Sequence, residues 1–400
     1  MFLRTKMARY AAAAWGFTVF MPVGVTWAAA FLMLIALLLS SDWRERAARV
    51  RASPLWWPLV AYVVWTLLVL AIRPHYAETA SNLVHGLRIA LTVAMALALT
   101  KDEALWGLRA FVGIALFNIV YIAVFYLLLM RWGIWLPMPN VIHGVIVLLG
   151  NKSISNALLF TMLGAAAAAA GLSQLLAHRP YRAIGFIAVT LATAAIVTLN
   201  LPSRTSLLAL LIVLPAICLH QWRRQWRSLA MALAIGAAAL AVVAWQLPSV
   251  EQKIAVGVAE IEAAKAGAVS EGSWVVRYHM YTETGRMIAE RPITGWGIGA
   301  WNSEWRRRGP PLLADYNMPH NDYLWMGSQA GLPGLVALLA IILAGVWQAW
   351  KRPDLNGRIA FAAMLILLMA TGVNSALRDA QIGLAILWIA MLALRRSGPD

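Results

Sequence analysis

The sequence predicts an all-α polytopic membrane protein, and both its composition and its hydropathy support that prediction. Of its 400 residues, 62% are hydrophobic and only 12% are charged, whereas roughly a quarter of a soluble domain is charged. The mean hydropathy is +0.71. These figures exclude a soluble enzyme and a disordered chain, and the single cysteine, Cys218, excludes a disulfide scaffold.

Apolar runs long enough to cross a bilayer recur along the whole chain, since a span needs about 20 apolar residues. Ten such runs are Leu55–Ile72, Asn82–Thr100, Leu105–Met130, Ile154–Ala177, Ala183–Leu199, Thr205–His220, Ser228–Leu247, Leu335–Trp350, Ile359–Ser375 and Ala380–Leu394. The uncharged stretch Tyr10–Ser40 would be about 46 Å long as one helix, so we expect Pro22 and Gly24 to divide it. The sequence therefore predicts about 12 transmembrane helices.

The basic residues predict how these spans are oriented. With twelve spans, nineteen Lys and Arg residues fall on the side of the two termini and six fall on the other side. Because basic residues concentrate in the cytoplasm, we expect both termini there, and the net charge of +16 requires no nucleic acid partner. We expect transmembrane helices 1–9 in residues 1–247, an outward-facing loop with short amphipathic helices in 248–319, and a motif helix with spans 10–12 in 320–400. Function is expected in or beside the loop, because long ordered loops are usually functional.

Three outward-facing residues are candidates for chemistry. Arg204 lies in a short polar turn that opens a helix, where backbone N–H groups and a guanidinium can bind one anion; the alternative is an interfacial anchor. Arg277 lies in the long loop, where an ordinary salt bridge is the alternative. His320 follows Pro319 and begins a predicted helix that ends at Gly331. The helix macrodipole is expected to keep the imidazole neutral and able to act as a base, although a capping or core histidine is the commoner case.

Two sequence patterns around these residues resemble those of a known family. His320, Asn321, Gly331 and Gly334 form a His-Asn-x9-Gly-x2-Gly pattern that resembles the motif of bacterial O-antigen ligases. Arg204 and Arg277 correspond to the two arginines that accompany this histidine in the family. The run Pro-Ile-x-Gly-x-Gly-x-Gly at 292–299 is similar to a loop of the O-antigen ligase/polymerase superfamily.

The resemblance implies a function and a mechanism. It implies transfer of O-antigen polysaccharide from undecaprenyl diphosphate to a hydroxyl of lipid A-core oligosaccharide in lipopolysaccharide assembly, at the periplasmic face of the bacterial inner membrane. The fold would be similar to the GT-C glycosyltransferases. His320 would be the general base of an inverting reaction, and Arg204 and Arg277 would bind the donor diphosphate.

No cofactor and no metal are expected. Metal-using relatives of this fold class place acidic residues in the first outer loop, where residues 22–24 are here Pro, Val and Gly. No Asp-x-Asp occurs, and Glu260 and Glu262 would point to different faces of a helix. The arginines are expected to replace a cation.

Further polar residues carry weaker predictions. Arg88 lies inside the fourth predicted span near its outer end, where it is expected either to help bind the diphosphate or to extend toward the headgroups. Arg306, Arg307, Arg308 and Trp305 are candidates for acceptor binding. The alternatives are a solvated charge run and a helix-anchoring tryptophan.

Three other functions share this topology. A repeat-unit polymerase would use the same lipid donor at both sites. A protein O-oligosaccharyltransferase carries the same histidine motif. A non-enzymatic flippase for lipid-linked oligosaccharides would need charged residues along a route through both leaflets, whereas the predicted polar clusters lie on one side.

Overall fold

The computed structural model describes residues 2–133, 140–142, 145–147, 152–201, 203–231, 234 and 248–398. The helices are α1 (Phe2–Thr18), α2 (Val23–Leu38), α3 (Trp43–Ala52), α4 (Trp56–Ile72), α5 (Thr79–Ala98), α6 (Lys101–Trp132), α7 (Ser153–Leu176), α8 (Pro180–Ala195), α9 (Arg204–Trp222), α11 (Pro248–Lys265), α12 (Ser273–Glu290), α13 (Ala300–Arg308), α14 (Asp322–Lys351), α15 (Leu355–Val373) and α16 (Ala380–Ser397). A π-helical turn, η1 (Ile196–Asn200), extends α8, and a 3-10 turn, η2 (Pro311–Leu313), follows α13. Two short strands, β1 (Asn140–Ile142) and β2 (Val145–Val147), pair antiparallel.

The helical membrane protein expected from the sequence is observed. Within the described ranges, eight helices are long and apolar enough to cross a bilayer, and a ninth results if α2 and α3, bent by 111°, form one span. The eight are α5, α6, α7, α8 with η1, α9, α14, α15 and α16. The expected span Ser228–Leu247 falls largely outside the described residues, so the count of twelve stays a prediction.

The first apolar stretch is divided at Pro22, as expected, whereas Gly24 lies inside α2 and does not break it. α1 ends at Thr18 and α2 begins at Val23, with Pro22 as its N-cap residue. Proline has no N–H to donate to the preceding turn, so the helix cannot continue through it. The chain turns back here, and α2 packs on α1.

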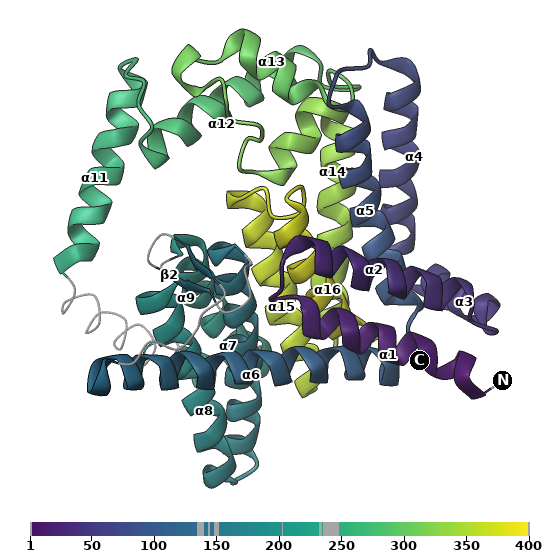
Figure 1. The fold of residues 1–400 in the computed structure, drawn as a ribbon, viewed down its shortest axis with the longest axis vertical. Helices are drawn as coiled ribbons and strands as arrows, with labels where there is room; N and C mark the ends of the chain where they lie inside the picture. The colour runs from purple at the N-terminus through teal and green to yellow at the C-terminus, as the bar shows by residue number, and fades with distance from the viewer. Residues whose placement is uncertain are drawn as a thin grey trace.

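Figure 1 shows that α1, α2 and α6 run across the direction of α4, α5 and α14. α1 packs closely on α6 because two glycines meet: a Cβ on Gly16 would lie 2.1 Å from the carbonyl oxygen of Gly107. Trp15 of α1 stacks on Trp388 of α16, with ring centroids 4.0 Å apart. α16 is the most enclosed candidate span in the described chain, with 83% of its apolar window buried, so it forms the centre of the bundle.

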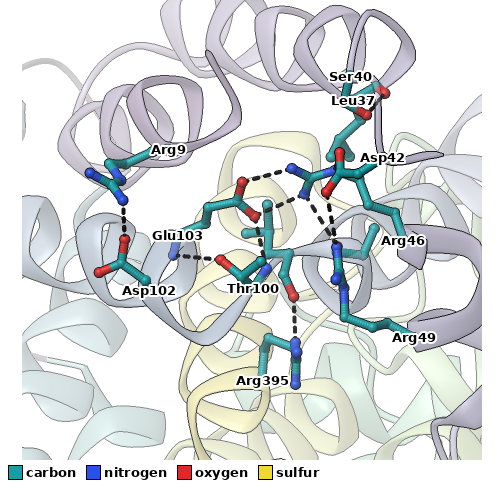
Figure 2. A network of polar contacts seen from close by, with 12 residues as sticks. Arg9, Leu37, Ser40, Asp42, Arg46, Arg49, Thr100, Asp102, Glu103 and Arg395 are labelled. Carbon is teal, nitrogen blue, oxygen red and sulfur yellow. Dashed lines mark hydrogen bonds and ion pairs between the residues drawn. The ribbon is translucent and has the colours of Figure 1, made fainter. Parts of the chain in front are cut away.

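A buried polar network joins α3, the start of α6 and the end of α16 (Figure 2). Arg46 forms a two-pronged ion pair with Glu103, with N–O distances of 2.8 and 2.7 Å, and each residue is only 4% exposed. Glu103 also accepts the N–H of Thr100 at 2.8 Å and completes a capping box at the start of α6. Arg395 donates to the carbonyl oxygen of Leu99. The network fixes the last turn of α16, whereas the candidate site lies near the first.

Candidate functional site

A cavity of about 630 Å³ lies where α7, α9 and α12 begin and where α15 ends. Its polar lining residues are Ser153, Ser203, Arg204, Thr205, Ser273, Arg277, Tyr278, Tyr281, Thr282 and Asn374, and aliphatic residues and Trp274 complete the wall. We call it the arginine cavity, because it brings together two arginines that are 73 positions apart in the sequence. Among the described residues that line it, none is acidic.

The two arginines are presented differently. Arg277, one turn into α12, donates to the hydroxyl and to the carbonyl oxygen of Ser273, one turn earlier on the same helix. Arg204 is the first residue of α9 and is exposed. Within the described part of the chain, its guanidinium forms no hydrogen bond or ion pair. Because neither guanidinium is neutralised by a carboxylate here, both can bind an anion.

Three helices begin at this cavity, and two of them, α7 and α9, add to its positive character, whereas the Glu260 carboxylate accepts an N–H at the start of α12. Ser153 and Ile154 open α7, Arg204 opens α9, and Ser273 opens α12. The first turn of a helix carries unpaired N–H groups and the positive end of the macrodipole. Ser203 caps α9 by accepting the N–H of Ser206 at 3.2 Å. Helix ends and guanidinium groups therefore favour the same kind of ligand, a phosphate or diphosphate.

His320 lies beside the cavity and adopts an unusual backbone conformation. Its φ is 52°, a left-handed value that costs a non-glycine residue about 1–2 kcal/mol. The hydroxyl of Tyr281, which lines the cavity, donates to the carbonyl oxygen of His320 at 3.1 Å. The ring of Tyr316 meets the imidazole edge to face, with centroids 6.1 Å apart. His320 is thus positioned next to the arginine cavity by residues that precede it in the chain.

The imidazole is held neutral, as the sequence suggested, but for another reason. Burial of the ring lowers the pKa of His320 to about 4, and the positive charges of Arg277 and Lys152 lower it further. The sequence analysis attributed this effect to the dipole of a helix beginning at His320. The structure instead starts α14 at Asp322, with Asn321 as the N-cap residue, so the histidine lies one residue before the cap. The direction of the expected pKa shift is confirmed, and its main causes are burial and neighbouring charge.

Asn321 fixes the histidine segment at both sides. Its side-chain oxygen accepts the N–H groups of Tyr323 at 2.9 Å and Leu324 at 3.0 Å, which caps α14. Its side-chain nitrogen donates to the carbonyl oxygen of Gly372 at 2.7 Å. The residue after His320 therefore ties the start of α14 to the end of α15.

The two glycines of the motif leave room for close packing, Gly331 against backbone and Gly334 against side chains. Gly331 breaks α14 with φ 68°, as the sequence predicted, and a Cβ there would lie 2.1 Å from the carbonyl oxygen of Ile293. The N–H of Leu332 donates to the carbonyl oxygen of Pro292 at 2.7 Å, and that of Gly297 donates to Gln329 at 3.0 Å. Loop 292–299 thus packs directly on the break and satisfies backbone groups that the interrupted helix leaves free. Gly334 follows one turn later, where a Cβ would lie 2.6 Å from that of Ala330.

Three residues of the site were missed by sequence reasoning. Tyr281 stands four residues after Arg277 and so shares its helix face. Asp322 is fully buried and accepts the N–H groups of Leu377 and Arg378 at 2.7 and 2.9 Å, which fixes the turn between α15 and α16. Asn374, on the cavity wall, donates to the hydroxyl of Thr205 at 2.8 Å. Only Tyr281 had a signal in the sequence, its spacing from Arg277.

Arg88 does not reach the arginine cavity. It is 5% exposed and donates to the carbonyl oxygens of Leu377 and Arg378, the latter at 3.1 Å. The same turn is held by the Asp322 carboxylate. These contacts assign Arg88 a role in positioning the turn before α16, and the predicted contact with the diphosphate has no support in this geometry.

The predicted acceptor residues lie on α13. Their carboxylate partners are Glu78 for Arg306 at 3.4 Å, Glu304 for Arg307 at 2.5 Å, and Glu290 for Arg308 at 2.7 Å. Trp305 is fully buried, stacks on Trp301 with centroids 5.5 Å apart, and donates to the carbonyl oxygen of Leu313 at 2.8 Å. Trp305 therefore presents no face to a sugar, and its predicted acceptor contact is not supported.

The sequence predicts that no metal is bound. In the described ranges, no three His, Cys, Asp or Glu side chains are grouped as metal ligands. Glu260 instead accepts the N–H of Trp274 at 3.0 Å, at the start of α12. Metal independence stays a prediction.

The comparison with known proteins gives a family match over the part of the chain that holds most of the site. Residues 186–339 match the family described as O-antigen ligase. No curated protein matches the chain. The matched stretch contains Arg204, Arg277, loop 292–299, His320 and Gly331, whereas Arg88 lies outside it. The stretch of the chain that holds Arg204, Arg277 and His320 is therefore similar to the family described as O-antigen ligase.

Proposed function

We propose that this chain is an O-antigen ligase that transfers a glycan from undecaprenyl diphosphate to a hydroxyl of lipid A-core oligosaccharide. One observation carries the proposal: Arg204 and Arg277 share a cavity that has no acidic residue among its described lining residues, beside a neutral histidine. A lipid-linked sugar diphosphate is an anion with a built-in leaving group, so the site needs no nucleotide.

The arginines would bind the diphosphate and stabilise it as it leaves. Each guanidinium can donate two parallel N–H groups to phosphate oxygens. The free N–H groups at the starts of α7 and α9 can add further donors. Negative charge grows on the bridging oxygen as its bond to the sugar breaks, and fixed positive groups aimed there lower the barrier.

His320 would accept the proton of the acceptor hydroxyl. In one inverting step, the hydroxyl oxygen bonds to the anomeric carbon, the bond from that carbon to the diphosphate oxygen breaks, and the proton passes to the imidazole. A base with a pKa of about 4 is weak. The negative donor would offset the charge of Arg277, which is one cause of the low value, and so strengthen the base when it is needed.

The reaction would require no divalent cation, because the arginines supply the positive charge. Purified protein should keep its transfer activity in EDTA. Activity that disappears in EDTA and returns with magnesium or manganese would overturn this part of the proposal.

The proposal also includes the arrangement in the membrane: twelve spans in a GT-C-like fold, with both termini cytoplasmic and the arginine cavity periplasmic. The starts of α7 and α9, both predicted to face outward, support it because both line the cavity. A cysteine at residue 270 in a Cys218-free chain should be labelled by an impermeant reagent in intact spheroplasts. Labelling only after the membrane is opened would contradict the arrangement.

The decisive experiment is reconstitution of the purified chain in vesicles with its lipid-linked glycan and with lipid A-core. Appearance of glycan joined to lipid A-core, absent with the His320→Gln variant, is the expected result. Growth of the lipid-linked glycan without any lipid A-core product would instead identify a repeat-unit polymerase. Glycan joined to protein would identify a protein O-oligosaccharyltransferase, and movement across the bilayer without a new glycosidic bond would identify a flippase.

A further inference from the structure

A second polar cavity, of about 470 Å³, lies between α12 and the segment after α13. Its walls include Tyr278, His279, Thr282, Glu283, Arg286 and Arg308. We call it the side cavity. Its volume is within the range of roughly 300–1,000 Å³ that small-molecule sites occupy.

The side cavity adjoins the arginine cavity. Tyr278 and Thr282 line both cavities. They are four residues apart on α12 and therefore lie one above the other along one ridge of the helix. Arg277 and Tyr281 line only the arginine cavity, and Glu283 and Arg286 line only the side cavity. A ligand extending from the arginine cavity over this ridge would enter the side cavity.

The two cavities differ in charge. In the side cavity, Glu283 pairs with Arg286 at 3.2 Å and with Arg308 at 3.6 Å. Arg308 is also paired with Glu290 at 2.7 Å and with Glu304 at 2.9 Å. Its charges are thus largely compensated, whereas the arginine cavity has two arginines and no acidic lining residue among the described ones. The side cavity is therefore a poor phosphate site.

The same groups are suited to a neutral, hydroxyl-rich ligand. The carboxylate of Glu283 can accept hydrogen bonds from two hydroxyl groups. The guanidinium of Arg286, whose side chain is 70% exposed, can donate hydrogen bonds to neighbouring hydroxyl oxygens. The rings of Tyr278 and His279 meet edge to face, with centroids 5.5 Å apart, and offer an apolar surface beside these polar groups. Planar polar groups next to aromatic rings match the alternating hydroxyl and C–H faces of a sugar.

We propose that the side cavity is a saccharide-binding subsite next to the diphosphate site. The inference rests on the proposed function. A glycan whose diphosphate is bound in the arginine cavity must extend out of that cavity from its first sugar onward. The saccharide can belong to the donor glycan or to the acceptor core, because both present the same hydroxyl chemistry.

The test is a direct binding measurement that requires no transfer reaction. Saturation-transfer NMR of the purified full-length protein would use two probes from the producing bacterium: glycan released from its lipid-linked donor by mild acid, and core oligosaccharide from its deacylated lipopolysaccharide. We expect one probe to receive saturation, and the probe that does so identifies the source. Arg286→Ala and Glu283→Gln should each weaken its binding at least fivefold.

Two controls separate this inference from the proposed function. Arg291→Ala removes a charge near the end of the same helix, where Arg291 packs on Trp296 at 4.1 Å outside the side cavity, and should leave saccharide binding unchanged. Saturating inorganic pyrophosphate should not displace the saccharide, because it would occupy the arginine cavity. The inference would be overturned by any of three results: neither probe binds, the Arg286 and Glu283 variants bind the probe as tightly as the parent protein does, or pyrophosphate displaces the probe. Each result counts whether or not the protein transfers glycan.

Discussion

The hydroxyl of Tyr281 is predicted to position His320, and removing it by Tyr281→Phe should slow transfer without weakening donor binding. The hydroxyl donates to the carbonyl oxygen of His320 at 3.1 Å, where the backbone has its left-handed φ of 52°. Without that bond, the segment can relax toward a less strained conformation in which the imidazole no longer meets the acceptor hydroxyl.

The magnitude follows from the energies involved. A neutral hydrogen bond contributes about 0.5–1.5 kcal/mol. The left-handed backbone conformation that this bond holds in place costs about 1–2 kcal/mol. Losing the bond should therefore reduce the population of the reactive conformation, and with it kcat, about 3–10-fold. The KM for the donor should change less than about twofold, since both arginines remain. Loss of the base itself is a larger effect, on the order of 100-fold.

The assay is steady-state transfer in reconstituted vesicles, with Tyr76→Phe as a matched control. The Tyr76 hydroxyl also donates to a backbone carbonyl, that of Trp296, at 3.1 Å, but away from the arginine cavity. Both variants should lose similar stability, and only Tyr281→Phe should lose kcat. An equal loss of kcat in both variants, or a Tyr281→Phe effect confined to KM, would refute the positioning role.

Four further predictions test the site and the fold. His320→Ala and His320→Gln should each lower transfer about 100-fold or more while donor binding is retained; near-parent transfer by the Gln variant would rule out the base. A base is active above its pKa, so kcat/KM should stay flat as pH falls to about 5 and decline only near the His320 pKa of about 4, and a decline centred near pH 6.5 would contradict the buried imidazole. Arg204→Lys and Arg277→Lys should each lose most activity because a point charge cannot reproduce the guanidinium fork; near-normal turnover by both would make the arginines mere anchors. Glu103→Gln should destabilise the protein by up to about 3–5 kcal/mol because the buried Arg46 loses its two-pronged partner and keeps only Asp42 as a carboxylate partner. Asp102→Asn, at an exposed ion pair with Arg9, should cost at most about 1 kcal/mol. Equal apparent melting temperatures in detergent for these two variants would contradict the network.

Much of the fold was predictable because the bilayer imposes it. A chain that must bury its backbone polar groups in hydrocarbon forms helices of about 20 apolar residues, so hydropathy located α5, α7, α9 and α16 closely. Pro22 located the first turn, because proline cannot donate a helical hydrogen bond. The positions of α1, α2 and α6 across the other helices were not predictable, since hydropathy carries no information on which helices pack together.

The candidate site divides in the same way. Arg204, Arg277 and His320 stand out in the sequence because ionisable groups near apolar spans are costly and their local patterns match a family. Sequence spacing could not indicate that the two arginines line one cavity, that burial rather than the helix dipole is the first cause of the low His320 pKa, or that Tyr281 holds the backbone of His320. Nor could it separate Arg277, one turn into α12 with no carboxylate partner, from Arg308, which three carboxylates surround. Residue type and local spacing determined which side chains were candidates. Only the packing of distant helices decided which of them share a cavity, because charge compensation and burial depend on neighbours in space and not on neighbours in the chain.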